Sequence, residues 1–239
     1  MSNLAHYTLL APLFVYPDER YPELAKAAER AMRADYPVAA DLLQKFIDML
    51  PPVDAEAPEI ALNETQEIFT RSFEVQSLTT LDVGYIVFGD DYKRAELLVN
   101  LNREHRLVEN DCGTELSDHL PNVLRLLAVW EDEDLALEFV QQILHPSLQR
   151  MVEEFHPERI ERRNAIYIKH HRTLIVTSEL RAMMYCYLLQ SLRDVLRRDF
   201  EYVHEAPLKQ SDEFLRSITR ELEIADKGAG HRPSAGRTP

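Results

Sequence analysis

The chain has 239 residues, of which 45% are hydrophobic and 28% charged, so it can build a globular core, and wholesale disorder or a coiled-coil rod is excluded. Only 6 residues are glycine, and their spacing excludes the GxGxxG and P-loop elements with which many enzymes bind nucleotide phosphates. The formal net charge is -14, and residues 1–158 carry 30 acidic against 12 basic side chains, which makes nucleic acid and anionic lipid unfavourable partners.

Helical signals run along most of the chain. Proline is absent from residues 59–120, 122–145 and 158–206, and glycine is rare there, so long helices are permitted. Apolar residues recur at three- and four-residue intervals, and no segment shows sustained strand-like alternation, so the predicted fold class is all-α. In chain order we expect helices over residues 4–15, 21–33, 38–50, 60–78, 91–108, 119–130, 133–145, 146–155, 164–203 (with room for a break) and 211–224.

The predicted elements form one domain and a tail. We expect residues 1–205 to fold as a single bundle of about nine or ten helices and residues 206–225 to add a C-terminal helix. Residues 226–239 are small and basic and have no apolar periodicity, which predicts a disordered tail. Cys112 and Cys186 are isolated, so reduced thiols and a cytoplasmic protein are expected, with no membrane segment.

The first candidate site is the segment Glu115-Leu-Ser-Asp-His-Leu-Pro121, which follows the turn at Gly113 and opens the predicted helix 119–130. Ser117 or Asp118 can cap that helix by accepting hydrogen bonds from its free N–H groups, and proline suits a first turn. Capping explains these residues without any further function. The functional alternative is an exposed Asp118–His119 pair that hydrogen-bonds a partner or the partner's cofactor.

A second candidate is a pair of Glu-x-x-His spacings, which helical bundles use to hold two iron ions. The pairs are Glu153 with His156 and Glu201 with His204. Both histidines are predicted at helix ends close to a proline, whereas ligands converge in mid-helix, so chance is the better explanation. We expect no metal site, no catalytic residue and no enzymatic activity, and a metal-dependent, di-iron-like bundle enzyme is the alternative.

Four stretches of sequence, taken in order, form a recognisable pattern. They are Leu9–Glu19, Phe69–Glu74 followed by Gly89–Arg94, and Glu115–Pro121. The pattern resembles the NarJ/TorD/DmsD family of maturation chaperones for molybdenum enzymes, over about residues 4–200. The resemblance implies a TorD-like helical fold.

The resemblance also implies a function in binding. Such a protein is a cytoplasmic, system-specific chaperone that binds the catalytic subunit of a molybdenum oxidoreductase and its twin-arginine leader until cofactor insertion and export. It has no cofactor of its own, although the client's molybdopterin guanine dinucleotide is contacted transiently, and subunits can exchange elements, so a homodimer is one expected form. An acidic body suits an Arg-Arg leader, because guanidinium–carboxylate pairs can be bidentate. The client-binding residues carried over by position are Glu115, Asp118, His119 and Pro121, together with Gly89, Asp90 and Arg94.

The identity of the client is indicated only by the positions at which this chain departs from the sequence pattern of the family. Between Phe73 and Gly89 the chain lacks the Leu-Tyr-Leu and His-x-x-Gly elements of nitrate reductase chaperones, and residues 156–204 are longer and more basic. This is closer to the branch that serves periplasmic type II enzymes of the dimethyl sulfoxide reductase family, such as the selenate, chlorate, dimethyl sulfide and ethylbenzene enzymes. A generic adaptor that binds an unrelated helix is the remaining alternative.

Overall fold

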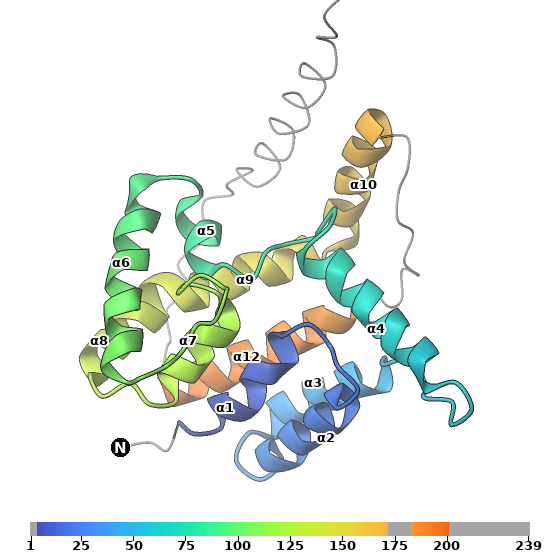
Figure 1. The fold of residues 1–239 in the computed structure, drawn as a ribbon, viewed down its shortest axis with the longest axis horizontal. Helices are drawn as coiled ribbons and strands as arrows, with labels where there is room; N and C mark the ends of the chain where they lie inside the picture. The colour runs from blue at the N-terminus through green and yellow to red at the C-terminus, as the bar shows by residue number, and fades with distance from the viewer. Residues whose placement is uncertain (1–3, 172–182, 201–239) are drawn as a thin grey trace, which may run out of the picture.

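The computed structural model describes residues 4–171 and 183–200, and in these residues it contains helices and turns but no β-strand (Figure 1). The predicted all-α class is therefore confirmed for the described part of the chain. Nine of the described helices have seven or more residues. One cluster of buried apolar side chains extends from Tyr7 to Leu196, so these helices share a single core.

The N-terminal helices pack on one another, and the third of them packs closely against the last described helix. Ser191 of that last helix donates a hydrogen bond of 2.9 Å to the carbonyl of Ala39, and the small side chains at this contact let the two backbones approach. The N-terminal elements are α1 (Tyr7–Leu10), the 3-10 turn η1 (Ala11–Phe14), α2 (Tyr21–Met32) and α3 (Pro37–Asp48), and the last described helix is α12 (Met184–Asp199).

The middle of the chain supplies the other helices. Figure 1 shows α5, α6 and α8 on one side of the molecule and α4 and α10 on the opposite side. Proline stands in the first two positions of α2, α3, α4, α7 and α9, where its fixed φ suits the helix and its missing N–H costs no hydrogen bond. The elements are α4 (Pro58–Phe73), α5 (Val83–Phe88), α6 (Tyr92–Leu107), α7 (Leu120–Leu127), α8 (Glu133–Phe139), the π-helical segment η2 (Val140–Leu144), α9 (His145–Glu154) and α10 (Pro157–His171).

Asp199, the last residue of α12, ties that helix to the start of the chain. Its carboxylate accepts hydrogen bonds from His6 Nε2 and the Tyr7 hydroxyl, both at 2.7 Å. It also accepts one from the Tyr36 hydroxyl at 2.5 Å, just before α3 begins. We call this group the Asp199 clasp, because it joins the two ends of the described chain.

The helix predicted over residues 60–78 ends earlier, at Phe73, and α5 forms where no helix was predicted. The chain reverses at Gln76, whose φ is 48°, and the buried guanidinium of Arg163 donates to carbonyls of Ser77 and Leu78 in this turn. These tertiary hydrogen bonds stabilise a turn that has no proline or glycine. Six residues, the length of α5, are too few for periodicity to reveal a helix.

Only some of the helices predicted for the C-terminal part of the chain lie within the described residues. Within the long helix expected over residues 164–203, α10 begins earlier, at Pro157, and α12 covers the later part. Pro157 occupies the first helical position, which proline favours. The predicted helix 211–224 and tail 226–239, like the end of the 1–205 domain, lie outside the described residues.

Candidate functional site

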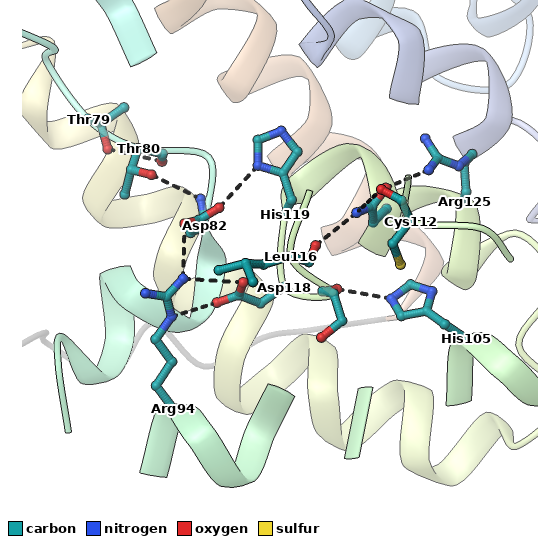
Figure 2. Close-up of polar contacts among 12 residues, drawn as sticks. Thr79, Thr80, Asp82, Arg94, His105, Cys112, Leu116, Asp118, His119 and Arg125 are labelled. Atoms are coloured by element: carbon teal, nitrogen blue, oxygen red, sulfur yellow. Dashed lines mark hydrogen bonds and ion pairs between the residues drawn. The ribbon is translucent and has the colours of Figure 1, made fainter. Parts of the chain in front are cut away.

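Arg94 and Asp118 are two of the residues that the family resemblance assigns to client binding. They pair with each other between α5, α6 and α7 (Figure 2). Arg94 Nε donates to Asp118 Oδ2 at 3.0 Å, and Nη2 reaches Oδ1 at 3.4 Å. The same Nη2 donates to Oδ2 of Asp82 at 2.9 Å. Because Asp82 is the residue before α5 and Asp118 lies in the loop before α7, one guanidinium connects three helices.

His119 closes the cluster on the other side of Asp82. Its Nδ1 lies 3.1 Å from Asp82 Oδ1. An isolated antiparallel bridge aligns the two backbones: the Val83 N–H donates to the carbonyl of Asp118 at 3.0 Å, and the Leu120 N–H donates to that of Leu81 at 2.9 Å. We refer to Asp82, Arg94, Asp118 and His119 as the Arg94 cluster.

The members of the Arg94 cluster differ in burial, and its two carboxyl groups differ in the direction of their pKa shifts. The Asp118 side chain has no exposed surface, whereas those of His119 and Asp82 are 19% and 26% exposed. Burial raises the pKa of Asp118, and its hydrogen bonds with Arg94 offset this only in part. Burial would also raise the pKa of Asp82, but the hydrogen bond and charge of His119, with the charge of Arg94, hold it below its ordinary value. Asp82 is therefore the more firmly ionised carboxylate.

Two neighbours of Asp82 in sequence shape the same cluster. A Cβ atom on Gly84 would lie 2.6 Å from Asp118 Oδ2 and 2.8 Å from Cδ2 of Leu97, so only glycine fits there without movement. The Arg94 guanidinium lies over the Tyr85 ring, 5.2 Å from its centroid. Sequence reasoning missed Asp82, Gly84 and Tyr85, although an aspartate directly before an apolar run is a recognisable helix-start signal.

The capping role predicted for Asp118 is wrong. The residue before α7 is His119, which makes no side-chain capping bond, and the Asp118 carboxylate is turned toward Arg94 instead. Ser117 is not a cap either, because its hydroxyl donates to the carbonyl of Leu98 in α6 at 3.1 Å. The motif therefore fastens its loop to α6.

His105 of α6 holds the loop before α7 at Ser117, and sequence reasoning did not identify this residue. Its Nε2 lies 2.9 Å from the Ser117 carbonyl, and its Nδ1 lies 2.8 Å from the amide Nδ2 of Asn110. Since a carbonyl only accepts, Nε2 carries the proton and Nδ1 accepts from the amide. Burial lowers the pKa of His105, with an opposing effect of the Ser117 carbonyl, so the ring is neutral at physiological pH.

The other carried-over residues take no part in the Arg94 cluster. Gly89 ends α5 with a φ of 61°, and Asp90 is exposed in the turn that follows. Glu115 is exposed in the loop, and Pro121 is buried in the first turn of α7. A client-binding role for these residues stays a prediction.

The first two of the stretches that resemble the family, Leu9–Glu19 and Phe69–Glu74, contact each other at Tyr16. Its ring packs edge-on against Phe69 of α4, with 5.7 Å between the centroids, and Gln66 of α4 donates to the Pro17 carbonyl at 2.8 Å. Tyr16 is 49% exposed and borders two hollows, one of about 250 Å³ over α4 and one of about 170 Å³ between η1, α2 and α7. We call Tyr16 and these two hollows the Tyr16 surface.

The metal-enzyme alternative gains no support from the described residues, in which no three His, Cys, Asp or Glu side chains gather closely enough to hold a metal ion. Glu153 lies in α9 and His156 follows it, whereas Glu201 and His204 are outside the described part. Among the helices that were described, none is long and apolar enough to cross a membrane.

Over the described residues the fold is all-helical, ion pairs join α5, α6 and α7, and the half-exposed Tyr16 borders two hollows. Comparison of the chain with protein-family models, with curated proteins and with solved structures finds no match.

Proposed function

We propose that this protein is a maturation chaperone that binds the catalytic subunit of a molybdenum oxidoreductase, and its twin-arginine leader, before cofactor insertion and export. The observation that carries the proposal is that the stretches of sequence resembling such chaperones contact each other in the fold. Tyr16 packs on Phe69, and Arg94 pairs with Asp118. Contacts between these stretches are what a fold in common with such chaperones would produce.

The Tyr16 surface is the proposed docking site for the client's leader. Val15 and Tyr16 are 45% and 49% exposed and offer apolar area to the apolar face of a leader helix. Glu67 lines the hollow beside Tyr16 and is positioned to accept a guanidinium, which can bind a carboxylate through two hydrogen bonds. The large excess of acidic residues in the first two thirds of the chain favours the approach of a basic leader.

The Arg94 cluster has a positioning role in this proposal. It fixes the start of α7, and Arg125 of α7 lines the second hollow of the Tyr16 surface. Within the cluster, the partly exposed pair of Asp82 and His119 is the part that a client can reach, because Asp118 is fully covered.

Affinity purification tests the proposal. The tagged full-length protein is recovered at low and at high salt from its own cells, grown under anaerobic respiration, and mass spectrometry identifies the proteins that accompany it. We expect a large molybdenum enzyme subunit that is retained at low salt and released at high salt.

Two matched variants locate the binding site in the same experiment. Tyr16→Ala and Glu67→Gln should each reduce the recovered client, whereas Ile60→Ala, at a residue on α4 that is 63% exposed and lines neither hollow, should not. Circular dichroism confirms that each variant is folded. A folded wild-type protein that recovers no molybdenum enzyme subunit would contradict the proposed function.

A further inference from the structure

The three most exposed large apolar side chains among the described residues all belong to α6. They are Tyr92, Leu107 and Val99, which are 72%, 71% and 69% exposed. The opposite face of α6 already packs against the rest of the protein, since Leu101 is buried there and Arg94 pairs with Asp118. A surface helix ordinarily keeps its large apolar side chains on the side that faces the core, so three of them on the solvent side of α6 suggest a second partner for that side.

The outward residues form a continuous stripe. At 100° per residue, Tyr92, Val99 and Arg103 lie within about 40° of one another around the helix axis. Glu96, Arg106 and Leu107 flank them, and all six residues are exposed. We call these six residues the α6 stripe.

The order of charges along the α6 stripe makes it complementary to itself. Glu96 stands three residues before Val99, and Arg103 stands four residues after it. If two copies of α6 pair antiparallel about a two-fold axis at Val99, Glu96 of each copy faces Arg103 of the other. A parallel pair would instead place Glu96 against Glu96 and Arg103 against Arg103, and like charges repel.

The ends of the stripe match in the same arrangement. Antiparallel pairing brings Tyr92 of one copy opposite Arg106 and Leu107 of the other, which offers a cation–π contact and apolar packing. Within its own chain Arg103 contacts Glu104 at 3.1 Å, but its side chain is 66% exposed, and exposed pairs of this kind contribute little and can be exchanged.

We propose that the α6 stripe is a homodimer interface in which two copies of this chain pair antiparallel, with Val99 on the two-fold axis. Isologous interfaces of this type require one patch that is complementary to itself, which the stripe provides. The helix is only about 24 Å long. Its single face is smaller than the roughly 1,200–2,000 Å² of a standard stable interface, so the dimer is reversible and forms as the concentration rises. Because α4 lies on the side of the molecule opposite α6 (Figure 1), the hollow over α4 stays accessible in the dimer.

Sedimentation velocity of the full-length chain over a wide concentration range tests this proposal independently of any client. We expect the wild type to shift from monomer to dimer, and Val99→Arg to remain monomeric at every concentration, because two positive charges then meet on the axis. Val38→Arg is the matched control, since Val38 lies on α3 and is 58% exposed. It should associate like the wild type.

Charge exchange tests the antiparallel geometry itself. Glu96→Arg and Arg103→Glu should each weaken the dimer when alone, because each variant places like charges in both pairs. A mixture of the two variants restores opposite charges in both pairs and should associate roughly tenfold more tightly than either variant alone.

Three results would overturn the proposal. They are a wild type that stays monomeric throughout, a Val99→Arg variant that dimerises like Val38→Arg, and a mixture of charge variants that associates no better than its components. If the wild type is monomeric and Val99→Cys also resists thiol labelling in a Cys112→Ser background, another part of the same chain covers the α6 stripe.

Discussion

Gly84 of α5 and Asp118 are so close that a methyl group on Gly84 would lie 2.6 Å from the Asp118 carboxylate oxygen. This proximity explains why α5 can run beside the loop before α7. The close packing of α5 against this loop therefore depends on the absence of a side chain at residue 84. Elsewhere in a helix, glycine is less favourable than alanine by about 0.5–1 kcal/mol.

Gly84→Ala should therefore destabilise the protein in spite of alanine's better helix propensity. Arg94 holds the Asp118 carboxylate in place, so the added methyl forces a shift that we expect to cost about 1–3 kcal/mol of the free energy of unfolding. Urea denaturation measures this loss. In an Asp118→Ala background the same substitution should cost clearly less, and an equal cost in both backgrounds would show that the contact with Asp118 is not the cause.

Replacing Arg94 should harm the protein mainly through the carboxylate that it leaves behind. Arg94→Leu buries Asp118 without its donor, and we expect a loss of about 3–5 kcal/mol of the free energy of unfolding. Adding Asp118→Asn removes the buried charge, so the double variant should be more stable than Arg94→Leu alone. A double variant of lower stability would mean that Asp118 has another important partner.

His105 should make stability depend on pH near neutrality. Its folded pKa is lowered from an ordinary value of 6.5, so as the pH falls the unfolded chain takes up the proton first. The stability contributed by neutral His105 is therefore full above about pH 6.5 and declines as the pH falls toward the folded pKa. The difference in unfolding free energy between wild type and His105→Asn should shrink between pH 7.5 and 5. A constant difference would contradict this assignment.

The Asp199 clasp should respond to acid in a lower range. Burial would raise the pKa of Asp199, but hydrogen bonds from His6, Tyr36 and Tyr7 bring it below 3.8. A depressed folded pKa means that the stability is present above the unfolded value and is lost as the pH falls through the folded value. Asp199→Asn should therefore be less stable than the wild type at pH 6, and the two should converge under acid.

Tyr36→Phe is the more conservative test of the same clasp. It removes one hydrogen bond to a charged group and should cost about 1.5–3 kcal/mol at neutral pH. Calorimetry or urea denaturation gives this value. If Tyr36→Phe is as stable as the wild type, the Tyr36 hydroxyl does not stabilise the clasp.

The sequence was most informative where signals are local. The predicted helix 91–108 closely matches α6, because its boundaries depend on a nearby aspartate and on a turn. The Arg94 cluster was harder to predict. Arg94 and Asp118 were both singled out as client contacts, yet they bind each other across 24 residues of chain, and no periodicity encodes such a pairing.

Asp82 and His105 were missed for a related reason. Each is an isolated polar residue in an unremarkable stretch of sequence, and its importance arises only when tertiary packing brings the loop before α7 against it. The turn at Gln76 is similar, because the guanidinium groups that stabilise it come from α4 and α10.

The clasp has a consequence for how the protein is made. His6 and Asp199 are 193 residues apart, and α12, which lies at the centre of the core, is the last described helix to be synthesised. Until α12 leaves the ribosome, the nascent α3 lacks the helix against which it packs most closely, although α2 and α3 can already pack on each other. The core can then be completed only when nearly the whole described chain has been made, and contacts this distant in sequence form slowly. Incomplete translation products should accordingly be open to proteolysis and aggregation.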